Sequence, residues 1–380
     1  MRYKFEDIAI NSIAKKKPTE ADKFTYIGLE HLDPGTFVVS RYGSEVAPKG
    51  EKLLMKKGDV LFGKRRAYQK KVAIAPFDGI FSAHGMVLRP KEDVVESAFF
   101  PFFISSDYFL DAAINISVGS LSPTINWGTL KSLEFELPPL EEQRKLAELL
   151  WAANDAQEAY KKLSVATNEL ITAQFIEVFG DPKINLQGWK VKPLSEITIH
   201  ANNGITRRGS DEDGNIVLRL VEVQDGFIDY SSPNRMKLDD AEKERYLLKD
   251  GDFLFARVNG NPEYVGRCAV FRNTGEEVYH NDHIIRVRFD ASILNAVFAS
   301  ELLNSQYGKD EMKDKVKTSA GQYTINQAGI GSIKAPLPPI ETQNDFARFI
   351  IQAKKSRFEL QCAIKDLESI YKALLSENLG

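Results

Sequence analysis

A twenty-residue phrase occurs twice in this chain. Residues 124–143 read TINWGTLKSLEFELPPLEEQ, and residues 324–343 read TINQAGIGSIKAPLPPIETQ. Nine of the twenty positions are identical, and three more exchange Leu for Ile. Such self-similarity constrains the architecture more strongly than any local pattern, because each copy is expected to build the same supersecondary structure.

The similarity extends upstream of this phrase, in the same order in both halves. Two further pairs of segments match: KKGDVLFGK at 56–64 with KDGDFLFAR at 249–257, and HGMVLRP at 84–90 with HIIRVRF at 283–289. Chance can produce one short echo, but it does not produce an ordered series. We therefore interpret the 380 residues as two copies of a unit of about 190 residues. This length also suits two domains better than one core.

Each copy has the same internal order of patterns. Its first part consists of short apolar or alternating runs, such as FTYIGLEHL and KVAIAPF, which are broken by Gly, Pro, Asn and Asp. These runs predict strands, and residues 99–114 and 294–308 predict helices that pack on the sheets. The predicted fold class is therefore mixed α+β in both copies.

After each mixed segment, a Pro-Pro pair begins a long helix. Proline is favoured in the first turn of a helix, where its missing N–H would be unpaired anyway. Apolar side chains then follow 3-4 spacing for more than four heptads, which is typical of a coiled coil. The predicted helix–helix seam contains Leu146, Leu149, Tyr160, Leu163, Leu170, Phe346, Phe349, Leu360, Leu367, Ile370 and Leu374.

We predict that the two helices pair with each other, because each ends one copy of the same unit and their apolar spacing has the same phase. The chain then contains two duplicated mixed α/β globules joined by an antiparallel coiled coil, with approximate two-fold symmetry. The predicted divisions are a first globule at 1–137, a first long helix at 138–180, a second globule at 181–337 and a second long helix at 338–380.

The bulk composition excludes several classes of protein. The formal net charge of −3 argues against a globally basic DNA-coating protein, although local basic surfaces stay compatible with it. Cys268 and Cys362 are the only cysteines, which argues against a disulfide framework or a Cys-rich zinc site. No apolar stretch approaches ~20 residues and the N-terminus lacks a signal-peptide core, so we expect a soluble cytoplasmic protein without a membrane partner.

The repeated junction resembles that of a known family. A Thr-Ile-Asn segment, followed by Pro-Pro-[Leu/Ile]-Glu-x-Gln and a long helix, twice in one chain, resembles the specificity subunit of type I restriction–modification systems. Its most specific elements are residues 138–143, residues 338–343 and the FGDP at 179–182. The resemblance covers essentially the whole chain. It implies that each globule is a target-recognition domain that reads one half of a split, asymmetric DNA sequence, and that the helices set the unread spacing.

The same resemblance implies partners. The helices would dock two copies of a methyltransferase subunit that modifies adenine at N6 with S-adenosylmethionine, and a motor-nuclease subunit can join that complex. This chain itself would carry no cofactor and no metal. Independently of the family, a protein with two similar heads suits two groove contacts about one helical turn apart on double-stranded DNA.

Basic and amide side chains gather in several loops of both copies. Residues 49–71 alone hold nine basic and two acidic residues. Lys and Arg neutralise phosphates, Arg suits guanine edges and Asn suits adenine. The candidate DNA-binding residues are Lys64, Arg65, Arg66, Lys70, Lys71, Arg207, Arg208, Arg257, Asn259, Asn261, Arg267, Lys315, Lys317, Gln322 and Tyr323. The alternative for each is a solvated surface loop. The equivalent residues His84 and His283 suit either a buried structural role or a DNA-facing one.

The sequence predicts no catalytic site. NPEY at 261–264 is similar to the Asn-Pro-Pro-Tyr with which N6-adenine methyltransferases hold a flipped base, but Glu263 replaces the second Pro. The sequence also lacks a GxxxxGK[ST] phosphate loop. Two other functions stay open. Turnover of DNA by the purified chain would indicate a stand-alone two-lobed enzyme, and lack of salt-sensitive binding to duplexes would indicate a scaffold that binds no DNA.

Overall fold

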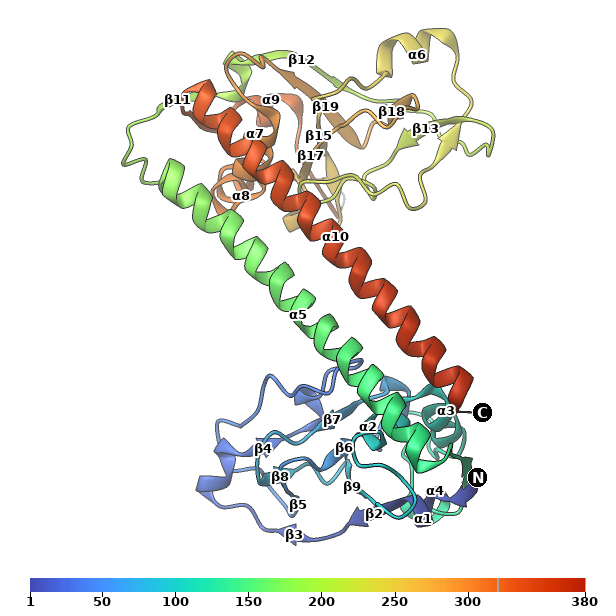
Figure 1. Ribbon diagram of the computed structural model, residues 1–380. Helices are drawn as coiled ribbons and strands as arrows, with labels where there is room; N and C mark the ends of the chain where they lie inside the picture. The colour runs from blue at the N-terminus through green and yellow to red at the C-terminus, as the bar shows by residue number, and fades with distance from the viewer. Residues whose placement is uncertain (320, 380) are drawn as a thin grey trace. The chain divides into compact units, whose positions relative to one another are not determined.

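The computed structural model describes residues 1–319 and 321–379 and divides into two compact units. Unit 1 comprises Met1–Ser164 with Glu359–Gly380, and unit 2 comprises Val165–Phe358. Each unit therefore contains part of both long helices, α5 (Leu140–Phe179) and α10 (Ile340–Asn378). Helices and sheets are mixed in both units, so the chain is an α+β protein (Figure 1).

Unit 1 is built on a four-stranded antiparallel sheet with helices on one face and a second sheet on the other. The main sheet has the order β2-β9-β6-β7, with strands Ala9–Ser12, Met86–Pro90, Val60–Phe62 and Val72–Ile74. The second sheet has the order β3-β5-β8-β4, with strands Lys15–Lys16, Lys52–Met55, Gly79–Phe81 and Tyr26–Ile27. Leu61 and Val87 of the main sheet pack against Phe81 of the second sheet, so this face of the main sheet is covered by strands.

The opposite face of the main sheet carries the largest core of unit 1. Val60 and Phe62 point into this core, whereas Leu61 between them points to the other face, as alternation along a strand requires. Phe5 lies at its centre, with ring centroids 5.0 Å from Phe109 and 5.9 Å from Phe135. The elements around this core are α1 (Phe5–Ile8), α2 (Phe100–Ser105), α3 (Asp107–Asn115), α4 (Trp127–Leu130) and the β1 (Arg2–Lys4) and β10 (Glu134–Glu136) pair.

Unit 2 repeats this plan. Its main sheet has the order β12-β19-β15-β17, with strands Thr198–Asn203, Ile284–Phe289, Phe253–Ala256 and Cys268–Val270. The second sheet is β14-β13-β18, with strands Arg235–Met236, Asn215–Leu218 and Val278–His280. The other elements are β11 (Lys190–Pro193), α6 (Asp240–Tyr246), β16 (Val258–Asn259), α7 (Ala296–Asn304), α8 (Gln306–Lys313), β20 (Lys317–Ser319), β21 (Gln322–Thr324), α9 (Gln327–Gly331) and β22 (Lys334–Leu337).

The repeated Gly-Asp of KKGDVLFGK and KDGDFLFAR is explained by the same clamp in each unit. Gly58 and Gly251 adopt φ of 90° and 85°, which a glycine tolerates best. The following aspartates, Asp59 and Asp252, are buried and each accepts two hydrogen bonds from an arginine of the neighbouring strand, Arg89 at 2.6 and 2.8 Å and Arg288 at 2.7 and 2.8 Å. A buried carboxylate needs such a bidentate partner, so these two residue types recur together.

The glutamine that ends the Pro-Pro phrase fastens each long helix to its unit. Gln143 is 1% exposed, accepts the Glu96 N–H at 2.8 Å and donates to the carbonyls of Val94 and Pro138 at 3.2 and 2.8 Å. Gln343 is fully buried and bonds the equivalent groups of unit 2: the Asn295 N–H, and the carbonyls of Ile293 and Pro338, at 2.9, 3.0 and 2.8 Å. One amide side chain therefore satisfies three backbone groups at the start of each helix.

In each unit, the segments of α5 and α10 run in opposite directions. In unit 1, Leu146 and Leu150 of α5 share a core with Leu375 and Leu379 of α10, and Gln157 Nε2 donates to Glu368 Oε1 at 3.1 Å. In unit 2, Phe175 of α5 packs on Phe346 of α10 with centroids 5.6 Å apart. Arg357 Nη1 donates to Asn168 Oδ1 at 2.7 Å.

Part of the predicted seam is wrong. At every second position of the seam, the residue that faces the other helix is the next one along the chain. Leu149, Leu170 and Ile370 are 57%, 52% and 51% exposed, and Leu163 is exposed as well. The less exposed positions at those turns are Leu150, Gln157, Ser164 and Ile171 of α5, and Ile350, Arg357, Ile364 and Tyr371 of α10. Both helices thus keep 3-4 spacing in a shifted phase. The other predicted seam residues lie at buried or half-buried positions: Leu146, Tyr160, Phe346, Phe349, Leu360, Leu367 and Leu374.

The shift has a physical cause. Two of the facing positions, Gln157 and Arg357, are polar and are satisfied by hydrogen bonds to Glu368 and Asn168 of the other helix. A search for apolar periodicity passes over such residues, so it does not fix the phase of the seam at these turns. Leu149 and Leu170 lie next to the apolar contact residues Leu150 and Ile171, so apolar spacing alone does not distinguish them, and both are exposed.

Candidate nucleic-acid interface

Three segments of unit 1 converge on one surface, which we call the three-loop surface. They are the basic loop after β6 (64–66), the turn after β8 that carries His84 (82–85), and the loop before the repeated Thr-Ile-Asn (117–124). Backbone hydrogen bonds join them: Arg65 N–H donates to the His84 carbonyl at 3.2 Å, and Arg66 N–H to the Pro123 carbonyl at 2.7 Å. Ile125 N–H donates to the Lys64 carbonyl at 2.9 Å. The loop positions are therefore held by the backbone.

Unit 2 joins the corresponding loops in a three-loop surface of its own, although the donor to the histidine carbonyl is shifted by one residue. This surface consists of 257–259 after β15, 281–283 after β18 and 317–324 before the second Thr-Ile-Asn, as far as that last segment is described. Arg257 N–H donates to the His283 carbonyl at 2.8 Å, and Ile325 N–H donates to the Arg257 carbonyl at 2.9 Å. The loop 204–209 joins this surface through Ile205, which forms a bridge with Asn281. The two copies of the repeat therefore place corresponding loops together.

Positive charge is concentrated on the three-loop surface of unit 1. Burial lowers the pKa of His84, and the cations of Arg65, Lys64 and Lys52 lower that pKa further because they lie close by. Burial, and then the charge of Lys15, lowers the pKa of Lys64. Among the described residues, Lys64, Arg65 and Arg66 form no ion pair with a carboxylate. Such clustered, unneutralised cations favour binding of an anion such as a phosphate backbone.

Lys70 and Lys71 turn away from this surface, although we predicted them on the same loop. Arg66 and Lys70, on either side of the turn at Ala67–Gln69, adopt left-handed φ of 55° and 48°. Lys71 Nζ then donates to the Leu29 carbonyl at 2.7 Å. Lys70 contacts Asp107 and Asp111 at 2.6 and 3.0 Å, and the hydrogen bond to Asp107 raises the pKa of Lys70. These contacts direct Lys70 to α3 and Lys71 to Leu29, and neither is a contact with the three-loop surface.

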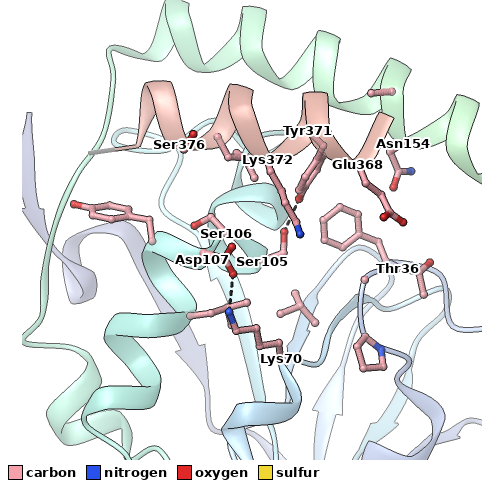
Figure 2. A pocket seen from close by; sticks show the side chains of 18 of the residues that line it. Thr36, Lys70, Ser105, Ser106, Asp107, Asn154, Glu368, Tyr371, Lys372 and Ser376 are labelled. Carbon is pink, nitrogen blue, oxygen red and sulfur yellow. Dashed lines mark hydrogen bonds and ion pairs between the residues drawn. The ribbon is translucent and has the colours of Figure 1, made fainter. Parts of the chain in front are cut away.

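Lys70 lies in a groove of about 900 Å³ within unit 1. Figure 2 shows it pointing at Asp107, with Tyr371 of α10 and Ser105 joined nearby. Phe37, Leu110 and Leu375 supply an apolar part of the wall, and Glu368 and Lys372 supply a charged part. Asp107 and Asp111 neutralise the charge of Lys70 within this groove. The groove is a separate feature from the three-loop surface, because different residues line it.

The predicted arginines of unit 2 are held by partners inside the unit. Arg207 pairs with Glu242 of α6 at 2.6 Å, Arg208 with Asp282 at 2.8 Å, and Arg267 with Asp225 at 3.0 Å. Arg267 also lies over the Tyr264 ring, 4.1 Å from its centroid, and the Arg257 Nη1 donates to the Asp282 carbonyl. Arg207 therefore attaches its loop to α6, and Arg208 attaches the same loop to Asp282 and His283 of the three-loop surface.

The remaining candidates have mixed surroundings. Asn261 Oδ1 accepts from the Glu263 N–H and begins the short helix Pro262–Tyr264, so NPEY is a capped turn. Asn259 Oδ1 accepts from the Asn261 N–H. Lys315 is tied to Glu311. Lys317 and Gln322 are exposed on β20 and β21, and half-buried Tyr323 packs on the core of unit 2.

Sequence reasoning missed several residues that orient these arginines. Ser122 Oγ accepts from Arg65 Nε at 2.9 Å, and Asp282 and Glu242 hold Arg208 and Arg207. These partners lie between 35 and 74 residues from their arginines. Only the position of Asp282 next to the repeated histidine could have indicated its role from the sequence.

The described residues show neither a metal centre nor a membrane helix. No group of three or more His, Cys, Asp or Glu in residues 1–319 and 321–379 is arranged to hold a metal ion. Within the same residues, no helix combines the length and apolarity that crossing a bilayer requires.

Comparison with known sequences finds a family match in the first part of the chain and similar proteins over more of its length. Residues 4–165 match the family described as type I restriction modification DNA specificity domain. The StySPI specificity subunit of Salmonella potsdam is 26% identical over 81% of this chain and 68% of its own length. The EcoKI specificity subunit of Escherichia coli K12 is 25% identical over 73% of this chain and 62% of its own.

A solved structure shares the fold of the whole chain. The S subunit of a type I restriction–modification system from M. genitalium matches with a TM-score of 0.66 at 14% sequence identity, and the match covers all of this chain and 96% of the other. At this level of identity, the match concerns the fold alone.

Proposed function

We propose that this chain is a type I restriction–modification specificity subunit and that it reads a split DNA target through its two three-loop surfaces. Each surface would address one half-site. The half-sites would differ, because Lys64, Arg65 and Arg66 in unit 1 are replaced by Arg257, Val258 and Asn259 in unit 2. Side chains of different hydrogen-bonding pattern select different base edges.

The observation that carries this proposal is the recurrence of the same loop convergence in both units. In both units the backbone joins the loop after the Gly-Asp strand to the histidine turn and to the segment before Thr-Ile-Asn, which supports a common use of this surface. The unneutralised cations of unit 1 and the half-exposed arginines of unit 2 supply the phosphate and base contacts that such a reader requires.

The paired helices would set the distance between the half-sites. Forty residues of α5 correspond to a span of ~60 Å at ~1.5 Å per residue. We further propose an antiparallel coiled coil, two duplicated globules with approximate two-fold symmetry, and the four-part division at 137, 180 and 337. The outward leucines of α5 would dock methyltransferase subunits in two copies, and a motor-nuclease subunit could join.

In this proposal the chain has no catalytic activity and acts in the cytoplasm. Methylation of adenine at N6 with S-adenosylmethionine would belong to the partner subunit. The chain's own contribution is to bind the half-sites and to orient the partners on them.

Long-read methylation sequencing of cells that carry the cognate methyltransferase, with and without this gene, tests the proposal. We expect a bipartite motif of methylated adenines only in cells with the gene. An unchanged methylation pattern, with a methyltransferase shown to be active, would overturn the proposed function and favour a scaffold.

The spacer role predicts a second result. Insertion of one helical turn, four residues, after Ser164 and at the facing position before Gln361 should lengthen the unread spacer by about one or two base pairs, since a turn rises ~5.4 Å. Both half-site sequences should stay the same, because the three-loop surfaces are untouched. A change of bases within a half-site would contradict the role of the helices as a spacer.

A further inference from the structure

The two repeated histidines occupy the same place in their units. His84 follows β8 and accepts Arg65 N–H at its carbonyl, and His283 follows β18 and accepts Arg257 N–H. The turn before each is fixed to the second sheet: Ser82 N–H donates to the Ile27 carbonyl and Asn281 N–H to the Leu218 carbonyl, both at 2.9 Å. Each imidazole is therefore carried by a backbone turn of defined position.

An arginine side chain meets each imidazole at Nε2. Arg65 Nη1 lies 3.3 Å from His84 Nε2, and Arg208 Nη2 lies 3.0 Å from His283 Nε2. The two arginines come from loops that do not correspond, because Arg65 follows β6 and Arg208 follows β12. The same pair of groups is thus assembled at the same turn from two different loops.

The chemistry of the pair assigns a role to each member. An arginine is always a cation and only donates, so the imidazole must be neutral and must accept through Nε2. The lowered pKa of His84 agrees with a neutral ring. A further acceptor completes each site: Ser122 Oγ for Arg65 Nε at 2.9 Å, and Asp282 Oδ1 for Arg208 Nη1 at 2.8 Å.

These contacts orient the guanidinium without using all of its five N–H groups. Among the described contacts, Arg65 leaves three N–H groups unused, both of Nη2 and one of Nη1. Arg208 Nη1 donates to the Thr206 carbonyl as well as to Asp282, so Arg208 leaves Nε–H and one N–H of Nη2 unused. Each arginine therefore retains at least two N–H donors, enough for the fork that matches O6 and N7 of guanine. The Arg208 side chain is 56% exposed and Arg65 lies at an exposed loop position, so this fork is accessible in both units.

We propose that Arg65 and Arg208 are specificity-determining residues that each read one guanine in the half-site of their own unit. His84 and His283 are positioning residues that hold the guanidinium fork before DNA binds. This inference rests on the proposed function and deepens it, because it names the base and the residues that select it. Ordering the side chain in the free protein lowers the entropy lost on binding.

The test uses the complete chain with its methyltransferase and sequences the methylated sites of variants. Arg65→Ala should relax one guanine position of one half-site by roughly tenfold or more, with the spacer and the other half-site unchanged. Arg208→Ala should do the same in the other half-site. His84→Ala and His283→Ala should relax the same positions more weakly, and combining each with its arginine variant should add no further relaxation.

Two variants serve as controls. Arg66→Ala, which removes a neighbouring exposed cation without a histidine contact, should lower methylation at all sites with the motif intact. His84→Gln, which restores a side-chain acceptor, should recover part of the selectivity. Equal melting temperatures of the variants would show that folding is preserved.

The possible results separate this inference from the proposed function. If Arg65→Ala and Arg208→Ala leave every position of the wild-type motif intact, the reading role is overturned although the wild-type motif still depends on the gene. If the histidine variants lower methylation uniformly without relaxing a guanine, the positioning role is overturned. If the wild-type chain produces no motif, the proposed function itself fails.

Discussion

Replacement of Gln343 by Ala should destabilise unit 2 by ~3–4 kcal/mol, because three buried backbone groups lose their partner. These groups are the Asn295 N–H and the carbonyls of Ile293 and Pro338. Gln143→Ala should have an effect of similar size in unit 1, where the Glu96 N–H is released. Denaturant unfolding measures the loss, and hydrogen exchange at the Glu96 and Asn295 amides locates it in the affected unit.

Matched glutamines provide the control. Gln157 makes an exposed hydrogen bond to Glu368 in unit 1, and Gln327 makes an exposed one to Asn203 in unit 2. Their replacement by Ala should change stability by no more than about 0.5 kcal/mol. Equal losses for the buried and exposed glutamines would show that the connection between each Pro-Pro junction and its unit does not depend on this side chain.

Unit 2 should lose stability in mild acid through His280. This histidine is fully buried, and among the described residues neither ring nitrogen has a hydrogen-bond partner. Burial, together with the nearby charge of Arg286, lowers its pKa from 6.5 to about 3, although backbone groups of Tyr246 and Asn202 favour the charged form. Tyr246 lies edge-on, with ring centroids 6.0 Å apart.

The sign follows from the two pKa values. The unfolded chain binds the proton near pH 6.5 and the folded unit only near pH 3, so the stabilising contribution is complete above pH 6.5 and falls as the pH falls. Between pH 7 and pH 4 we expect a loss of ~3 kcal/mol from this group. Unfolding of the complete chain at a series of pH values, with hydrogen exchange followed in each unit, measures it.

Unit 1 supplies the matched substitution, because Phe81 occupies the position of His280 in the parallel pairing with the neighbouring strand. His280→Phe should remove most of the acid dependence from unit 2 and leave unit 1 as before. The explanation would be wrong if the variant and the wild type lost stability with the same pH slope.

The repeat allowed much of the fold to be predicted. The strands around the repeated Gly-Asp, the helices near residues 100 and 300, and the start of each long helix follow local patterns that do not depend on distant residues. The candidate site was predicted only in part. The basic loops were found, but the directions of Lys70 and Arg207 depend on acidic partners that lie 37 and 35 residues away.

The sequence by itself determined the mixed α+β class and the two long helices, because periodicity, glycine turns and Pro-Pro starts are local. Only the tertiary structure decided which side of each helix is buried and which arginines are free to bind. Leu149 is exposed while polar Gln157 faces the other helix, since a polar side chain with a hydrogen-bond partner is tolerated at a contact position. Arg65 is held by the neutral hydroxyl of Ser122, whereas Arg207 is neutralised by Glu242. The partners that folding places beside an arginine therefore decide whether its charge stays available for binding.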